Sequence, residues 1–167
     1  MRVEKVDHVA IAVRSMEAAC RLFIDTLGGE FISGGDSGRR PVRTLQLRLA
    51  GTKLELIQSV VPDTYIDRFI EKHGEGFHHL TILVDDIHAA VAKLEAEGYE
   101  TVDLDDSTPA WSEAYVRPRS AFGTLIQLAE TDQGWDGPYP GVTLEAVLAG
   151  ECVWEERGPV RRDSVSA

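Results

Sequence analysis

Two histidines, one carboxylate and one amide occupy matching places in the two halves of this sequence. His8 and His79 each open an apolar, β-branched run and lie 71 residues apart (79 − 8 = 71). Glu55 and Gln127 each stand between two large aliphatic residues and lie 72 residues apart (127 − 55 = 72). Two imidazoles, a carboxylate and an amide oxygen suit a borderline divalent ion such as Mn²⁺, Co²⁺, Ni²⁺, Zn²⁺ or Fe²⁺. His8, Glu55, His79 and Gln127 are therefore the predicted ligands of one metal ion.

The elements that carry these residues repeat as well, which indicates a duplicated module. The interval is far longer than a solenoid unit, so two copies of one βαβββ unit are expected rather than a repeat array. The predicted fold class is α+β, with two paired βαβββ modules forming a cupped mixed sheet around the metal site. The predicted parts are a first module (1–61), a connecting helix (62–75), a second module (76–130) and a C-terminal extension (131–167).

Hydrophobic periodicity and turn residues give the expected element boundaries. Ser15 and Asp86 are the expected N-caps of two helices, which end near Gly28 and Gly98. Residues 34–40 and 103–107 are expected to be loops, and residues 160–167 to be loose. The expected strands are 6–13, 30–33, 42–49, 53–59, 77–84, 99–102, 113–117 and 124–129.

Strand parity predicts which of these side chains share a surface, because successive residues point to opposite faces. His8 alternates with the aliphatic residues expected to pack on the helices, and the same parity selects His79 over His78. Glu55 and Gln127 likewise face away from their aliphatic neighbours. A buried carboxylate without a cation or partner would cost several kcal/mol, which favours a metal beside Glu55.

Composition limits the class of protein. The chain has 167 residues, 43% of them hydrophobic and 27% charged, which is typical of a folded globular protein. A net charge of −11 disfavours nucleic acid and anionic membrane surfaces as partners, and no stretch approaches the ~20 apolar residues of a transmembrane helix. Strand-like sequence from the first residues leaves no room for a signal peptide, so a cytoplasmic location with Cys20 and Cys152 as thiols is expected.

Four segments resemble a known family, the vicinal oxygen chelate (glyoxalase, bleomycin resistance, dioxygenase) superfamily, and within it the methylmalonyl-CoA epimerases. The resemblance covers about residues 3–130 and is carried by segments 6–13, 76–87, 51–56 and 123–128. It implies paired modules around one metal ion and a homodimer. His8, Glu55 and His79 fall on the family's ligand positions.

One ligand position departs from that pattern. Such epimerases have a glutamate where this chain has Gln127, and an amide oxygen can coordinate a metal but cannot take up a proton. The departure places methylmalonyl-CoA itself in question as the substrate.

The leading functional prediction is a metal-dependent epimerase or isomerase that abstracts an α-proton from a small oxygenated substrate, of acyl-CoA or keto-sugar (cyclitol) type. Glu55 is the expected base, and Glu113 and Tyr115, with His78, are candidates for the second proton carrier. Residues on one face of a neighbouring strand are expected to contact the substrate: Thr44, Gln46 and Arg48, with Arg48 meeting an anionic group.

Two alternatives belong to other classes. A non-heme Fe(II) dioxygenase would use two histidines and one carboxylate, which His8, His79 and Glu55 could supply. A metal-independent binding or resistance protein would sequester a small molecule, although such members generally lack the ligands retained here.

Overall fold

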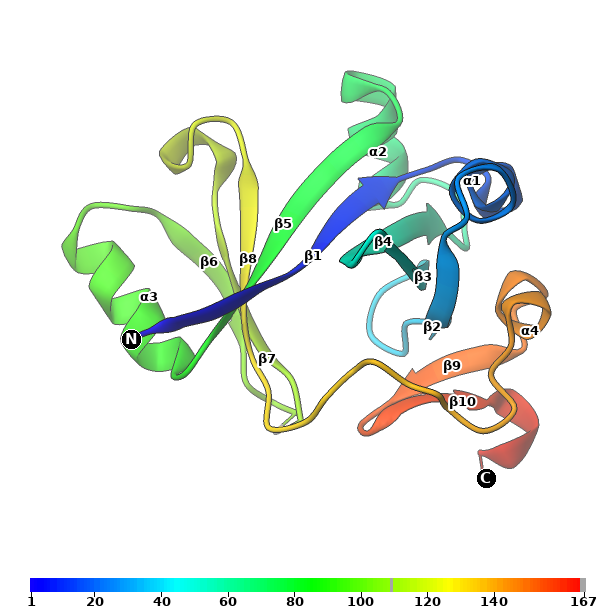
Figure 1. The fold of residues 1–167 in the computed structure, drawn as a ribbon. Coiled ribbons are helices and arrows are strands. Elements are labelled where there is room, and N and C mark those ends of the chain that lie inside the picture. Colours follow the sequence, from blue (N-terminus) through cyan, green and yellow to red (C-terminus); the bar gives the residue numbers. More distant parts are fainter. Residues whose placement is uncertain (109, 166–167) are drawn as a thin grey trace. The chain divides into compact units, whose positions relative to one another are not determined.

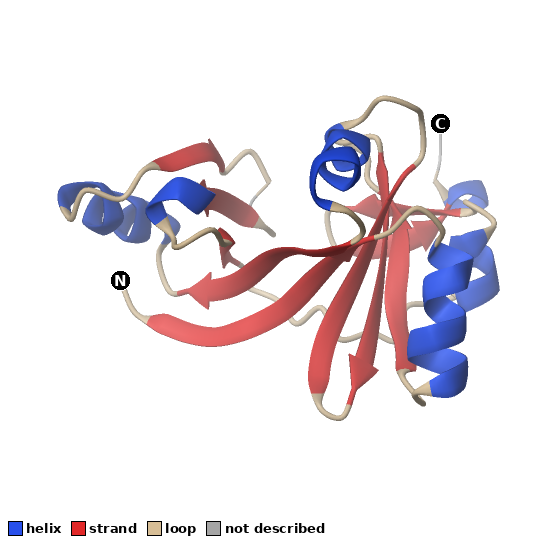
Figure 2. Cartoon of the chain, turned by 90° about the horizontal axis from the view of Figure 1, so that it is seen from above, coloured by secondary structure: helices blue, strands red, loops and turns tan. Residues whose placement is uncertain are grey.

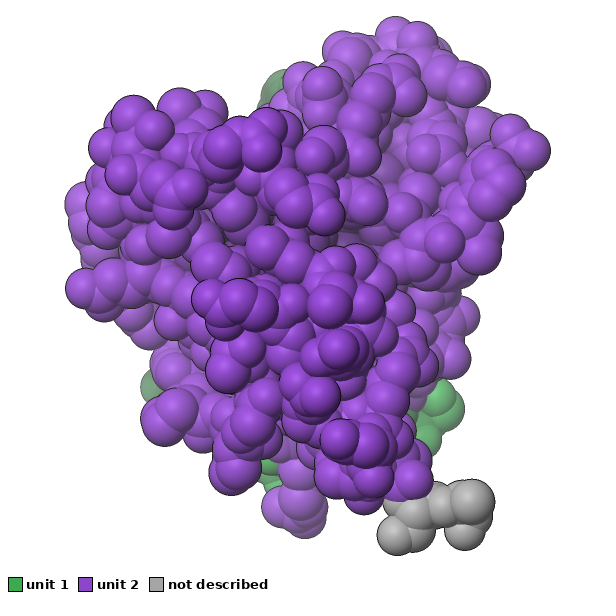
Figure 3. All heavy atoms as spheres, turned by 90° about the vertical axis from the view of Figure 1, so that its right-hand side faces the viewer, with its two compact units in different colours: residues 1–9, 78–134 green, residues 10–77, 135–167 purple. Residues whose placement is uncertain are grey.

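The computed structural model describes residues 1–108 and 110–165 and separates into two compact units (Figure 3). Unit 1 comprises Met1–Val9 and His78–Gly134, and unit 2 comprises Ala10–Phe77 and Trp135–Ala167. Residues 166 and 167 of the predicted C-terminal extension, and residue 109, lie outside the described residues. Each unit is a sheet with few helices, so the fold is a sheet-dominated α/β structure with a mixed, curved sheet (Figures 1 and 2).

The βαβββ order expected for each half is present along the chain. The first run is β1, α1, β2, β3 and β4, and the second is β5, α3, β6, β7 and β8, with α2 between them. Their bounds are β1 Val3–Ala12, α1 Met16–Cys20, β2 Glu30–Asp36, β3 Val42–Leu49, β4 Thr52–Ser59, α2 Tyr65–His73, β5 Gly76–Val84, α3 Ile87–Ala96, β6 Thr101–Asp105, β7 Ser112–Val116 and β8 Leu125–Glu130.

Local signals begin and end these helices as expected. Ser15 accepts a hydrogen bond from the Ala18 amide at the start of α1, and Asp86 accepts one from the Ala89 amide at the start of α3. A π-helix, Arg21–Thr26, continues α1, and the chain leaves it through Gly28 at φ 76°. Thr64 forms a capping box at the start of α2.

In unit 2 the strand order is β10 (Gly158–Arg161), β9 (Cys152–Glu155), β2, β3, β4 and β1. The antiparallel strands β2, β3 and β4 carry Glu55 and the predicted substrate-binding residues. Leu45, Leu47 and Leu56 are fully buried on one side, against α1 and the extension. On the other side Ala10 and Ala12 pack with residues of α2. The leucines lie on the predicted helix-facing side, whereas the face of β1 expected to lie away from the helices packs on α2 at Ala10 and Ala12.

The C-terminal extension is ordered within unit 2. It forms α4 Leu144–Leu148, β9 Cys152–Glu155, β10 Gly158–Arg161 and a short 3-10 turn, Arg162–Ser164, so the expectation that residues from 160 onward are loose was wrong for those described. Strand β9 pairs in parallel with the end of β2, where Asp36 lies opposite Val153.

The predicted loop at 34–40 was also wrong at its start, because β2 continues through Gly34 and Gly35. These glycines pair with Leu45 and Thr44 of β3. A Cβ at Gly34 would lie 2.6 Å from the Thr44 carbonyl oxygen, so the missing side chain is what allows the close approach.

In unit 1 the strand order is β1-β5-β8-β7-β6, with β5 and β8 parallel. Helix α3 packs on one face through a core that includes Val84, Ile87, Ala114 and Leu128. The acidic segment predicted as a loop instead continues β6 to Asp105, with an irregularity in the pairing and Asp103 at φ 55°. None of the helices among the described residues is long and apolar enough to cross a membrane.

Candidate metal centre and its polar surroundings

A chain of buried hydrogen bonds runs across the face of unit 1 that points away from α3. Thr81 lies opposite Gln127 in the parallel β5–β8 ladder, and its Oγ1 donates to Oε1 of Gln127 at 2.7 Å. The same Oγ1 lies 2.9 Å from Nε2 of His8. The three side chains are 0%, 6% and 3% exposed. Parity placed His8, Thr81 and Gln127 on one face, and these contacts agree with it.

Asp7 orients His8. Its Oδ2 lies 2.9 Å from Nδ1 of His8, and its Oδ1 lies 3.0 Å from Nζ of Lys5. A carboxylate accepts hydrogen bonds, so Nδ1 of His8 is the donor in this contact. Histidine ligands in metal sites commonly have this second partner. The sequence analysis missed Asp7, because a residue adjacent in a strand is expected to point to the opposite face.

His79 is held between two aromatic neighbours in unit 1. Its Nδ1 lies 2.8 Å from Nδ1 of His78, and the ring of Tyr115 stands edge-on to it, with centroids 6.5 Å apart. Burial lowers the pKa of His78 to about 4, so that ring is neutral at pH 7. The rings of His8 and His79 approach edge to face at 5.7 Å. His79 is 5% exposed and its Nε2 is fully buried.

Glu113 and Tyr115, two predicted proton carriers, lie beside Gln127. Nε2 of Gln127 donates to Oε2 of Glu113 at 2.6 Å and to the Tyr115 hydroxyl at 3.1 Å. Trp111 donates through Nε1 to the same Glu113 oxygen at 3.2 Å. Tyr115 is the antiparallel partner of Gln127, and Glu113 stands two residues earlier on the same face of β7. Both ends of the Gln127 amide are thus engaged within unit 1.

A row of hydrogen-bonded side chains in unit 2 supports Glu55. Gln46 lies opposite Glu55 in the β3–β4 ladder and donates to it from Nε2 at 3.1 Å. Ser33, opposite Gln46 in the β2–β3 ladder, donates to Oε1 of Gln46 at 3.3 Å. Glu55 is 9% exposed and Ser33 is fully buried. A predicted substrate-binding residue, Gln46, therefore positions the predicted base.

The other two predicted substrate-binding residues, Thr44 and Arg48, contact the extension. Trp154 donates from Nε1 to Oγ1 of Thr44 at 2.8 Å, and Arg48 donates from Nη2 to Oδ1 of Asp136 at 3.1 Å. No sequence pattern links residues 88 and 110 positions apart, so these partners were not predicted.

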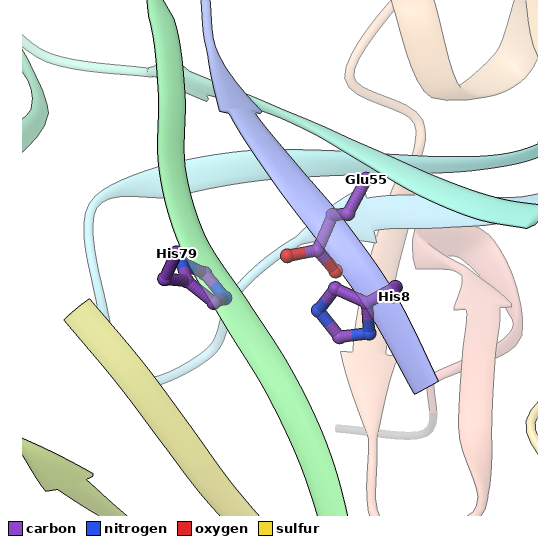
Figure 4. Close-up of side chains that lie close together, drawn as sticks. All are labelled: His8, Glu55 and His79. Carbon is purple, nitrogen blue, oxygen red and sulfur yellow. The ribbon is translucent and has the colours of Figure 1, made fainter. Parts of the chain in front are cut away.

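Three predicted metal ligands come together. Ligand atoms of His8, Glu55 and His79 all lie within 4.8 Å of one another, and Figure 4 shows the three side chains. Two imidazoles and one carboxylate are the donor set expected for Mn²⁺, Fe²⁺, Co²⁺, Ni²⁺ or Zn²⁺. With His8 already oriented by Asp7, these residues fit a divalent ion.

Comparison with known proteins agrees with this geometry. Residues 7–115 match the model of the Glyoxalase/Bleomycin resistance protein/Dioxygenase superfamily. The mitochondrial methylmalonyl-CoA epimerase of Dictyostelium discoideum is 30% identical over 131 residues, which cover 77% of this chain and 79% of the relative. The ethylmalonyl-CoA/methylmalonyl-CoA epimerase of Cereibacter sphaeroides is 29% identical over 132 residues, which cover 77% of this chain and 98% of the relative.

A solved structure has the same fold. The methylmalonyl-CoA epimerase from Mycobacterium tuberculosis superposes with a TM-score of 0.70 at 25% identity, covering 78% of this chain and 90% of that chain. The predicted fold class and the resemblance stated from the sequence are confirmed. The chain belongs to the glyoxalase/bleomycin resistance protein/dioxygenase superfamily.

Proposed function

We propose that the protein is a divalent-metal-dependent epimerase that inverts the carbon next to the thioester of a small acyl-CoA. The observation that carries the proposal is the grouping of His8, Glu55 and His79 ligand atoms within 4.8 Å in a chain whose relatives include methylmalonyl-CoA epimerases. Because the relatives described above act on acyl-CoA thioesters, the proposal excludes the keto-sugar substrates considered from the sequence. We place the enzyme in the cytoplasm, as a homodimer.

His8, Glu55 and His79 would hold the ion, with the Gln127 amide oxygen as a fourth donor. A bound divalent ion supplies Lewis-acid stabilisation of the negative charge that develops on the substrate oxygens, worth several kcal/mol. Asp7 accepts from Nδ1 of His8 and would hold the orientation of this ring.

Glu55 is the proposed base. Its carboxylate takes the α-proton as the C–H bond breaks, and the electron pair moves onto the thioester oxygen. Gln46 donates to Oε1 of Glu55 at 3.1 Å, and this hydrogen bond orients the carboxylate.

Inversion requires a proton donor on the opposite face of the substrate, and Glu113, with Tyr115, is proposed for that role. Gln127 cannot exchange a proton, but its Nε2 donates to Glu113 at 2.6 Å, so the amide positions a neighbouring carboxylate. Thr44, Gln46 and Arg48 are proposed to contact the substrate.

The test is α-proton exchange measured on protein with defined metal content. Chelator-treated protein would be reloaded with Co²⁺ or Mn²⁺ and incubated in D₂O with methylmalonyl-CoA or ethylmalonyl-CoA, and deuterium at the α-carbon would be followed by mass spectrometry. Exchange that requires the metal is expected, and His79→Ala should reduce both metal content and exchange by about 10²-fold or more.

His88→Gln is the matched control, because His88 is exposed and its Nε2 pairs with Asp106 at 3.1 Å. This variant should retain metal content and exchange. Exchange that persists in fully metal-free protein would contradict the metal role. Oxygen consumption with Fe²⁺ and no α-proton exchange would instead favour the dioxygenase alternative.

A further inference from the structure

Two cationic side chains stand side by side on the face of unit 2 that carries Glu55. Arg48 and Lys53 are direct partners in the β3–β4 ladder, two residues along each strand from the Gln46–Glu55 pair. Because side chains alternate along a strand, both pairs project from the same face. The Lys53 side chain is only 4% exposed, whereas that of Arg48 is 40% exposed. Buried lysines are rare unless an anion lies close to them.

The anion here comes from the C-terminal extension. One oxygen of Asp136, Oδ1, lies 3.1 Å from Nη2 of Arg48 and 3.4 Å from Nζ of Lys53. A single oxyanion between a guanidinium and an ammonium is also the arrangement in which proteins bind carboxylates and phosphates. Asp136 lies outside the part of the chain matched by the family, residues 7–115.

Aromatic contacts fix the segment that carries Asp136. The ring of Trp135 lies 5.9 Å from that of Trp154, and Trp154 donates to Thr44, four residues before Arg48 on the same face of β3. The extension therefore contacts β3 on both sides of Gln46. Asp136 itself remains half exposed, with a side-chain exposure of 50%.

Arg48 is the member of the cationic pair that is reachable from solvent, whereas Lys53 lies behind it with a side chain only 4% exposed. Arg48 and Asp136 line an open hollow of about 250 Å³ whose other walls are Glu30, Phe31, Ile32 and Pro138. This space exceeds what a carboxylate or phosphate group requires. Ion pairs as exposed as Arg48–Asp136 contribute little net stability, so an incoming anion can exchange with the Asp136 carboxylate.

We propose that Arg48 and Lys53 form an oxyanion subsite for the substrate. The Asp136 carboxylate occupies this subsite until an anionic ligand displaces it. The extension thereby sets the affinity and selectivity of the site for anionic ligands. Only the identity of the natural ligand rests on the proposed function: in an acyl-CoA the oxyanion is either a carboxylate of the acyl group or a phosphate of the carrier.

The test is a binding measurement that does not depend on turnover. Malonate and inorganic phosphate would be titrated separately into the full-length protein, and binding followed by calorimetry and by NMR. Asp136→Asn is expected to bind at least one of the two about fivefold more tightly than the unmodified chain, since it removes a competing ion pair. The preferred anion identifies the source of the oxyanion.

Three further variants make the result decisive. Adding Arg48→Met to Asp136→Asn should abolish the gain, and Asp136→Ser should reproduce it if the asparagine variant folds poorly. Asp163→Asn is the matched control in the same extension, because Asp163 is exposed and pairs with Arg161. Unchanged or weaker anion binding in both Asp136 variants, or a gain that survives the loss of Arg48, would overturn the proposal. Loss of epimerase activity alone would not, because no step of this measurement uses turnover.

Discussion

The Asp7 carboxylate lies 2.9 Å from Nδ1 of its neighbour His8, and both side chains are almost completely buried in unit 1. Adjacent residues of a strand normally project to opposite faces, yet here the shorter side chain turns to meet the ring. The pairing fixes the orientation of the His8 ring, as partners of histidine ligands commonly do. Asp7 is therefore expected to matter for the metal site although it is not itself a ligand.

Replacing Asp7 by Asn should weaken metal binding by about 10- to 100-fold, the usual effect of losing a carboxylate that supports a histidine ligand. Competition between the protein and a chelator for Co²⁺ measures the change. Asp85→Asn is a suitable control, because Asp85 is an exposed partner of Arg2 at the end of β5. Equal affinities in the Asp7 and Asp85 variants would show that Asp7 does not support the ligand.

The hydrogen bond between Gln127 and Glu113 predicts that exchanging the two residue types should restore stability that one substitution alone removes. Gln127→Glu places two carboxylates in contact at a site where each is less than a tenth exposed, and should lower the stability of metal-free protein by about 1–3 kcal/mol. Combining it with Glu113→Gln restores an amide–carboxylate hydrogen bond in the opposite direction. Thermal unfolding of the four proteins gives the coupling directly.

Additive losses in the double variant would mean that the 2.6 Å contact contributes no coupling. The same four proteins also report on chemistry. If Glu113 carries a proton, Glu113→Gln should slow α-proton exchange by about 10²-fold or more.

The duplicated pattern predicted the parts of the site that depend on strand periodicity. A 71-residue repeat and a period of two were sufficient to select His79 over His78 and to place Glu55 and Gln127 on the faces opposite the aliphatic residues. The internal βαβββ order followed from the same pattern, because each strand has one clear apolar face. The Thr81 contact with His8 was implied by parity but not singled out, since threonine is common in strands.

Contacts between distant segments could not be predicted in this way. The Trp154–Thr44 and Asp136–Arg48 contacts depend on how the extension folds back along β2, which no local pattern encodes. Gly34 and Gly35 suggested a loop because glycine is rare in strand interiors. Only the approach of Val147 and β9 to this edge explains why side chains are absent there.

Lowering the pH should remove the contribution that the Asp67 carboxylate makes to the stability of the fold. The Thr64 backbone amide donates to Asp67 at 2.9 Å in the capping box of α2 and holds the pKa of this carboxyl below its ordinary value of 3.8. A depressed pKa stabilises the fold above pH 3.8, and the contribution is lost as the pH falls through the lower, folded value. Because Asp67 is only partly buried, the expected contribution is modest, about 0.5 kcal/mol.

Asp67→Asn should therefore lower the melting temperature by about 1–2 °C at pH 7 and by nothing measurable at pH 3. Asp63→Asn, in the loop just before α2, is the control for a general effect of removing an acidic side chain. If the melting temperatures of Asp67→Asn and the unmodified chain diverged further as the pH fell, this explanation would be wrong.

The packing of the extension rests on a glycine that no other residue can replace without strain. Gly158 has φ +127°, and a Cβ there would lie 2.2 Å from Cε1 of Tyr139. Gly158→Ala should destabilise the extension by about 1–3 kcal/mol, since both the backbone and the ring must adjust. Amide hydrogen exchange should quicken in β9 and β10 but not in β3 and β4, and tryptophan emission should shift to the red as the Trp135–Trp154 pair loosens.

Gly38→Ala is the control, because a Cβ there meets nothing nearer than the Trp154 carbonyl at 3.7 Å. If the extension holds Asp136 against Arg48, Gly158→Ala should also tighten anion binding, in the same direction as removing the Asp136 carboxylate.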